Sequence, residues 1–128
     1  MSAWLSDAWV DAVAAELAEL RGPGSLTGSV QVDVTGGPDG DVGVHAELAG
    51  GRLVALRPGP AASPDAVLTL ADADARAVVN GDLEPAVAFM QGRMKVAGDM
   101  AVVLDLLVLS ASEEARAGRA RVAGLSAD

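Results

Sequence analysis

Residues 81–109 read GDLEPAVAFMQGRMKVAGDMAVVLDLLVL and predict a helix, a strand and a second helix in quick succession. Pro85 suits the first turn of a short helix, because its missing N–H would have no helical partner there. Residues 93–97 alternate basic and apolar side chains, which predicts a strand with two unlike faces. Asp99 then predicts the start of a helix over residues 99–109, since its carboxylate can accept from the free N–H groups of the first turn.

The helix over residues 99–109 is unusual because it is apolar around almost its whole circumference. Its two apolar stripes are Met100, Val103, Leu104 and Leu107, and Val102, Leu106 and Leu109. Only Asp105 interrupts them, and the helix is far shorter than the roughly 20 apolar residues that span a bilayer. A helix without a polar face has no side suited to water. One side should therefore pack on a sheet, while the other is either further core, the wall of a cavity or an interface.

The segment before this stretch predicts an N-terminal helix followed by four strands. Residues 1–20 carry apolar side chains at helical spacing with acidic residues elsewhere around the wheel, and Gly22-Pro23-Gly24 is expected to end that helix. From residue 27 the apolar period changes to two, with glycine-rich turns between the runs. This pattern predicts four strands within residues 27–70, of which the first three form an antiparallel meander.

Two short helices are predicted within residues 72–90, and a helix or tail over residues 112–124. Asp72 is expected to cap the first of the short helices, because aspartate is a favoured N-cap residue. The apolar side of the C-terminal segment is thin. We therefore expect that last helix to be frayed or loosely docked.

The basic residues of the fifth strand, Arg93 and Lys95, are expected on the open face of the sheet. There they could pair across strands with Asp33 or Glu47, each contact contributing about 0.2–1 kcal/mol. The alternative is a basic spot for a lipid headgroup or an acidic partner.

The composition indicates one domain over residues 1–128 with an aliphatic core. Hydrophobic residues make up 51% of the chain but aromatic residues only 2%. A net charge of −9 argues against nucleic acid, whose phosphates require clustered Lys and Arg, and against docking by charge on an anionic membrane. We expect no stable membrane insertion. The chain has no cysteine, no recognisable leader and no peroxisomal address at its end, so we expect a cytoplasmic location.

The sequence offers little that resembles a catalytic or metal site. His45 is the sole histidine, and catalytic or zinc-binding histidines usually need a second ligand or an orienting carboxylate. The chain has no tyrosine to serve as an oxyanion donor. Asp105 is the one acid placed among leucines, where loss of water could raise a carboxyl pKa. We therefore expect no catalytic residue, no metal and no cofactor.

Several features of the central stretch together resemble the sterol carrier protein-2 family of lipid-binding domains. The residues that carry the resemblance are Asp65-Ala-Val-Leu-Thr-Leu, Gly81-Asp82-Leu83, Pro85, Ala88-Phe89, Gly92-Arg93-Met94-Lys95-Val96, Gly98-Asp99 and the apolar helix behind them. The chain departs from the family pattern at Ala71, where Ser or Thr is usual, and at Arg93, where Lys is commoner. The resemblance implies an α+β fold, with one five-stranded mixed sheet, helices over one face and an apolar tunnel between the two layers.

The function that the resemblance implies is non-catalytic binding of an apolar small molecule, such as a fatty acyl chain, a sterol-like molecule or a polyketide-like lipid. The apolar residues expected to line the tunnel are Trp9, Val13, Leu48, Leu56, Phe89, Met90, Met94, Met100, Val103, Leu104 and Leu107.

Two other functions stay open at this point. The chain could be an interaction module that uses the helix over residues 99–109 as a homodimer or partner surface. It could also be an isomerase or cyclase for an apolar substrate, with Asp105 or His45 as the base.

Overall fold

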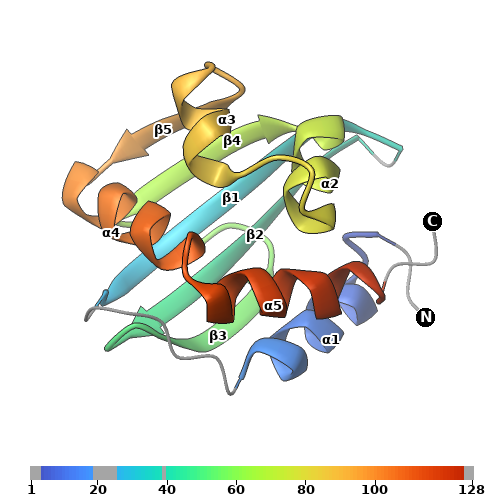
Figure 1. Cartoon of the computed structure of the whole chain (residues 1–128), viewed down its shortest axis with the longest axis horizontal. Helices are drawn as coiled ribbons and strands as arrows, with labels where there is room; N and C mark the ends of the chain where they lie inside the picture. Colours follow the sequence, from blue (N-terminus) through green and yellow to red (C-terminus); the bar gives the residue numbers. More distant parts are fainter. Residues whose placement is uncertain (1–3, 19–25, 39, 126–128) are drawn as a thin grey trace.

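The chain runs through a helix, four strands, two helices, a fifth strand and two further helices (Figure 1). The computed structural model describes residues 4–18, 26–38 and 40–125. Its elements are α1 (Asp7–Leu17), β1 (Gly28–Gly37), β2 (Gly40–Ala49), β3 (Arg52–Pro58), β4 (Ala66–Ala71), α2 (Asp72–Asn80), α3 (Pro85–Met90), β5 (Met94–Gly98), α4 (Met100–Ser110) and α5 (Glu113–Ala123).

Within the described residues, the strands form a five-stranded sheet in the order β3-β2-β1-β4-β5. β1 pairs with β4 in parallel, whereas β1 with β2, β2 with β3, and β4 with β5 are antiparallel. The predicted α+β fold with a mixed sheet is therefore confirmed. β1 is the central strand, and its inward side chains Val30 and Val34 are only 2% and 3% exposed.

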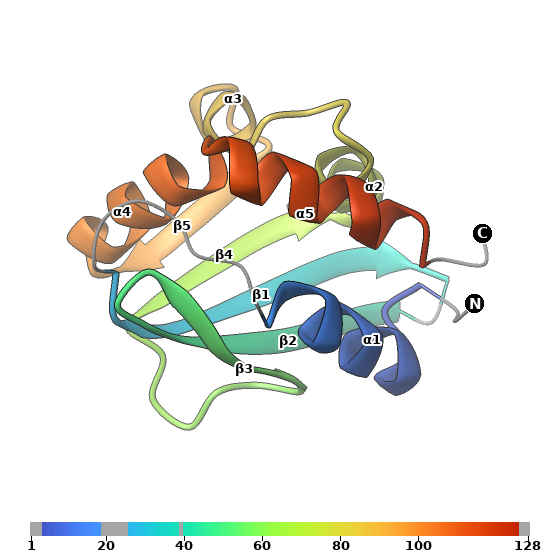
Figure 2. The same cartoon turned by 60° about the horizontal axis from the view of Figure 1, so that its bottom comes forward.

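The helices cover one face of the sheet (Figures 1 and 2). The covered face carries the apolar alternate residues of the strands, including Val44, Leu68 and Leu70, which join the buried core. The opposite face carries polar side chains such as Gln31 and His45. This division follows from the two-residue period of the strands, which sends neighbouring side chains to opposite faces.

α1 is shorter than the predicted N-terminal helix. It begins at Asp7, because the hydroxyl of Ser6 accepts a hydrogen bond from the N–H of Trp9 at 3.1 Å and caps the helix. Its buried side includes Trp9, Val10 and Val13. The predicted start at residues 1–3, and the glycine-proline turn at residues 22–24, lie outside the described residues.

The junction between β4 and α2 corrects the predicted cap. The N-cap position is Ala71, which forms no side-chain cap bond, and Asp72 is the first helical residue. Because β4 continues to Ala71 and turns directly into the helix, the Asp72 side chain is free to accept hydrogen bonds from Trp4 and Arg76 instead.

β5 also corrects the predicted charge pairs. It lies at the edge of the sheet beyond β4, so one strand separates it from β1 with Asp33 and two strands separate it from β2 with Glu47. Lys95 faces Thr69 of β4 rather than an acid. Arg93 precedes the strand and lies 3.9 Å from the carboxylate of Asp74 on α2. The predicted pairing of these basic residues with Asp33 or Glu47 is therefore not found.

α5 is more firmly docked than its composition predicts. Its small inward side consists of Ala115, Gly118 and Val122, all of them buried. Arg119 donates to the Ser110 carbonyl at 2.8 Å, and Arg121 forms an ion pair of 2.7 Å with Glu16 of α1. Small residues allow the helix to approach its neighbours closely, and Arg119 and Arg121 then anchor its second half.

A candidate apolar ligand site

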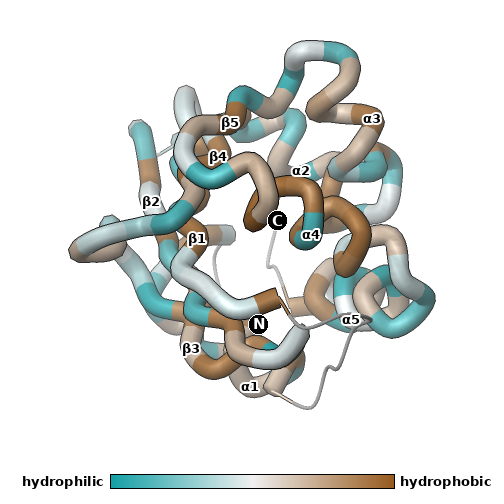
Figure 3. Tube along the Cα trace, turned by 90° about the vertical axis from the view of Figure 1, so that its left-hand side faces the viewer, coloured by the Kyte–Doolittle hydropathy of each residue, from teal (hydrophilic) through white to brown (hydrophobic). Residues whose placement is uncertain are grey.

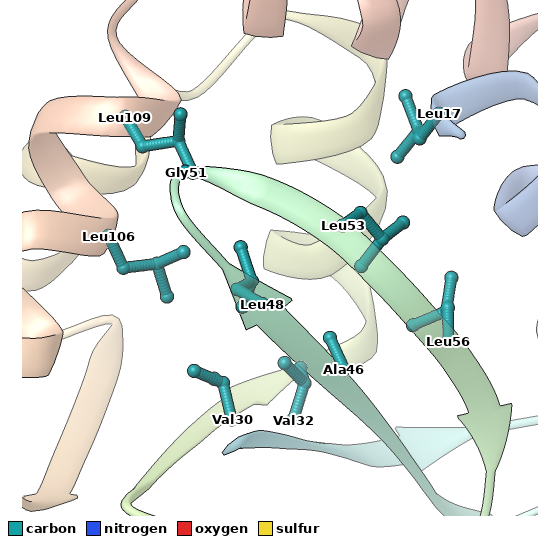
Figure 4. Close-up of a pocket in the computed structure, with 10 residues that line it drawn as sticks. All are labelled: Leu17, Val30, Val32, Ala46, Leu48, Gly51, Leu53, Leu56, Leu106 and Leu109. Atoms are coloured by element: carbon teal, nitrogen blue, oxygen red, sulfur yellow. The ribbon is translucent and has the colours of Figure 1, made fainter. Parts of the chain in front are cut away.

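An apolar cavity of about 210 Å³ lies between the sheet and two of the helices (Figure 4). Its lining residues are Leu17 of α1, Val30 and Val32 of β1, Ala46 and Leu48 of β2, Gly51, Leu53 and Leu56 of β3 and the turn before it, and Leu106 and Leu109 of α4. None of these carries a polar side chain. A water molecule needs two to four polar partners to be held in a cavity, so this one suits hydrocarbon.

The floor of the cavity follows from strand periodicity. Val30 and Val32 on β1, like Ala46 and Leu48 on β2, are two residues apart and project from the same face of the sheet. Ala46 is small and lies opposite Leu56 of β3. Its short side chain leaves room above the sheet that a larger residue would fill.

An irregularity in β3 places two leucines on the same wall. Glu47 pairs with Ala55 but Leu48 pairs with Leu53, so the register shifts and Val54 is an extra residue on the β3 side. In a regular strand, positions 53 and 56 would point to opposite faces. The bulge absorbs one residue, which allows both Leu53 and Leu56 to line the cavity while Val54 is 62% exposed.

α4 forms the opposing wall with one of its two apolar sides. Leu106 and Leu109 face the cavity, and Val102 and Val103 are buried against the core. Leu107 is partly buried against the core, and three further apolar side chains of this helix point away from the protein. These are Met100, Leu104 and Val108, which are 44%, 54% and 62% exposed.

The structure places two of the predicted lining residues, Leu48 and Leu56, on the cavity wall. The other nine lie elsewhere. Four of them are buried in the core, two are partly buried against it and three are exposed: Trp9, Val13, Met94 and Val103; Phe89 and Leu107; and Met90, Met100 and Leu104. Met90 is 82% exposed because α3 has only six residues and turns just its Ala88 side fully inward.

Eight lining residues were not predicted: Leu17, Val30, Val32, Ala46, Gly51, Leu53, Leu106 and Leu109. For the strand residues a usable signal existed, because Val30, Val32 and Ala46 share the alternation that includes Leu48. For α4 there was none, since both of its stripes are equally apolar.

The two candidate bases lie away from the cavity. The imidazole Nδ1 of His45 lies 2.8 Å from the carbonyl of Gly59, on the face of the sheet that carries Gln31. Asp105 is exposed on α4. Within the described part of the chain, no group of three or more His, Asp or Glu side chains is arranged to hold a metal ion.

A second, smaller hollow of about 150 Å³ has a polar lining. Its charged residues already bind one another, because Glu84 pairs with Arg116 at 3.1 Å and with Arg119 at 3.3 Å. Burial lowers the pKa of Arg119, an effect that the charge of Glu84 opposes. These ion pairs connect α5 to the start of α3 and give the hollow a structural role.

Among the described residues, no helix has both the length and the hydrophobicity needed to cross a membrane. The apolar residues of α4 either pack inside the protein or are exposed on its surface.

Comparisons with known proteins agree with this architecture. A conserved hypothetical protein of Thermus thermophilus, described as possibly a sterol carrier protein, superposes with a TM-score of 0.75 at 24% identity, over 95% of this chain and 93% of that one. The palmitated sterol carrier protein 2-like protein of Aedes aegypti superposes with a TM-score of 0.64 at 21% identity, over 79% and 89%. At such identities the likeness shows the fold.

Among curated proteins, mouse stomatin-like protein 1 is 47% identical over 47 residues, which are 37% of this chain. The match spans only 12% of that protein's length. The SCP-2 sterol transfer family matches residues 14–109, in agreement with the resemblance seen in the sequence. The chain belongs to the SCP-2 sterol transfer family.

Proposed function

We propose that the protein binds the hydrocarbon part of an amphiphilic small molecule in this cavity and carries it without chemical change. The observation that supports the proposal most directly is a cavity of about 210 Å³ with an entirely apolar lining. Membership of the SCP-2 sterol transfer family supports lipid binding in general. The cavity lies where the family resemblance implies an apolar tunnel, between the sheet and the helices.

Binding in such a cavity is driven by removal of hydrocarbon from water. Each methylene group that enters contributes about 0.8 kcal/mol. The lining offers no hydrogen-bond partner from a side chain, so a carboxylate or hydroxyl drawn inside would lose its water without compensation. The polar head of the ligand should therefore stay at the mouth of the cavity, in contact with solvent.

The volume favours a slender acyl chain over a sterol-like or polyketide-like molecule. Ligand pockets for drug-sized molecules usually measure about 300–1,000 Å³, and this cavity is smaller. A flexible chain can enter by its end and fill the space between Leu53 and Leu106, whereas a rigid ring system needs its full width at once. The palmitated form of the Aedes aegypti structure is consistent with this choice.

The residues that line the cavity favour a carrier role over the isomerase or cyclase alternative. Neither His45 nor Asp105 lines the cavity, so neither touches a molecule held there. The absence of catalysis, like the cytoplasmic location, stays a prediction.

The test uses two alanines on opposite faces of neighbouring strands. Ala46→Leu narrows the cavity, whereas Ala55→Leu adds the same atoms on the other face, opposite Glu47. Binding of the fluorescent fatty acid cis-parinaric acid and of the fluorescent sterol dehydroergosterol is titrated, with thermal unfolding as the check on folding. Ala46→Leu should weaken acyl binding about tenfold, the effect of losing about two buried methylenes.

We expect the Ala55→Leu protein to bind like the natural chain, and the acyl probe to bind more tightly than the sterol. If both variants fold and lose the same amount of cis-parinaric acid affinity, the ligand does not bind in this cavity. A sterol preference would overturn the choice of an acyl chain and retain the carrier function.

A further inference from the structure

The outer side of α4 carries a continuous row of apolar side chains in contact with solvent. Met100, Leu104 and Val108 are four residues apart, so they project from one side of the helix, and we call them the outer stripe. Their exposed fractions are 44%, 54% and 62%. Figure 3 looks onto this end of the protein and shows that α4 is hydrophobic along most of its length.

The outer stripe lies directly behind the cavity wall. Leu106 and Leu109 of the same helix face the cavity, so one helix, about 10 Å across, separates the cavity from whatever contacts the stripe. A movement of α4 caused by contact on its outer side would therefore act on the cavity wall itself.

Resting on the proposed function, we propose that the outer stripe docks on an uncharged, zwitterionic lipid surface, and that the cavity exchanges its cargo with that surface. The surface that holds amphiphiles would thus contact a helix that also bounds the cavity. Docking would bring α4, which forms one wall of the cavity, to the source of the ligand.

The charges of the protein select a neutral surface over an anionic one. α4 contains no Lys or Arg, and its one charged residue, Asp105, is exposed beside the outer stripe. The whole chain carries a net charge of −9. Basic residues are what attract proteins to anionic membranes, so an anionic surface would repel this helix, whereas a zwitterionic surface requires no complementary charge.

A second copy of the chain fits the outer stripe less well. Three partly exposed side chains offer far less than the roughly 800 Å² per partner that a standard-size interface buries. A symmetric pairing of α4 with itself would also bring together two copies of Asp105 with no base on either helix to balance them. Docking on a lipid surface requires neither a large complementary interface nor the approach of two Asp105 side chains.

The experiment measures flotation of the full chain with phosphatidylcholine vesicles and with vesicles in which part of that lipid is replaced by phosphatidylserine. The variant is Leu104→Gln/Val108→Gln, which makes the stripe polar without adding charge. Its matched control is Val54→Gln, since Val54 and Val108 are both 62% exposed and Val54 lies on β3. Binding of soluble cis-parinaric acid without vesicles is measured for every protein.

We expect the natural chain to float with phosphatidylcholine vesicles, and less with phosphatidylserine present. The double variant should lose about tenfold or more of this binding, while its binding of soluble cis-parinaric acid stays unchanged. Val54→Gln should retain both properties. Raising the salt concentration should not weaken binding to phosphatidylcholine, because the attraction is not between charges.

Three results would overturn the proposal. If the natural chain binds soluble cis-parinaric acid but not phosphatidylcholine vesicles, docking is wrong and the carrier function stands. If it binds neither, the proposed function itself fails. If sedimentation shows a dimer that the double variant abolishes, the stripe is covered by a second copy of the chain.

Discussion

Asp72, the first residue of α2, is the residue on which the polar contacts of Trp4 and Arg76 converge. Its carboxylate accepts from the indole Nε1 of Trp4 at 2.7 Å and from the Nε of Arg76 at 2.8 Å. The guanidinium of Arg76 also lies 4.9 Å from the centre of a Trp4 ring. Partial burial raises the pKa of Asp72, but the hydrogen bonds from Arg76 and Trp4, with the charge of Arg76, outweigh it and lower that pKa overall.

A lowered pKa means that the folded protein binds this proton less readily than the unfolded chain does. The contribution of Asp72 to stability is therefore fully present above its ordinary pKa of 3.8 and is lost as the pH falls through the folded value. Asp72→Asn should reduce the free energy of unfolding by about 1–2 kcal/mol at neutral pH. It should also show a smaller loss of stability as the pH falls below 3.8. Urea unfolding at a series of pH values measures both effects.

Asp74→Asn is the control for this prediction. Asp74 lies in the same first turn of α2, but its partner Arg93 is 3.9 Å away, so the loss at neutral pH should be smaller. If Asp72→Asn loses stability in acid as steeply as the natural chain, Asp72 is not the group that titrates.

The position of Asp72 at the start of a helix could be predicted from the sequence, but its hydrogen bond with Trp4 could not. Trp4 is 68 residues away along the chain, and no local pattern brings an indole to a carboxylate over that distance. Arg76, one helical turn later, is the partner that spacing does indicate.

At the scale of elements, Gly98 determines how β5 passes into α4. Its backbone has φ +99°, and a Cβ there would collide with the backbone carbonyl of Asp65 on the neighbouring chain segment. The N–H of Asp99 then donates to the same carbonyl at 2.7 Å, and the Asp99 side chain caps α4. The direction of α4, and with it the placement of Leu106 and Leu109, depends on this close approach.

Gly98→Ala should destabilise the protein by about 2 kcal/mol or more, because it adds a backbone collision to the strain of a positive φ. Gly92→Ala is the matched control. Gly92 has φ +75° and nothing within 4 Å of an added Cβ, so it should cost only about 1–2 kcal/mol. Thermal or urea unfolding gives the comparison. Equal losses in the two variants would show that the close approach to Asp65 is not tight in solution.

In α4 and β3 the sequence pattern does not predict which side chains face the cavity. An apolar stripe identifies the inner side of a helix only when the other side is polar, and α4 has no such contrast. The cavity-facing pair Leu106 and Leu109 therefore could not be told from the solvent-facing Met100 and Leu104. In β3, the extra residue Val54 shifts the alternation, and the sequence has no glycine or proline there to signal the bulge.

At the scale of the whole molecule, the sheet and its covering helices could be predicted, and the shape of the cavity could not. The change from helical to strand period near residue 27 and the glycine-rich turns indicate the elements. Their order in the sheet, with β1 beside β4, does not follow from periodicity, because periodicity does not say which strands pair. The cavity depends on the sizes of side chains from five elements, including the small Ala46, and these meet only in three dimensions.

The central claim is that this cavity holds an apolar molecule, and native mass spectrometry of freshly purified protein, paired with lipid analysis after denaturing extraction, tests it most directly. We predict an additional mass that disappears on denaturation, and an extracted amphiphile with a slender hydrocarbon chain. A bare protein mass, together with no uptake of either cis-parinaric acid or dehydroergosterol, would contradict the carrier function.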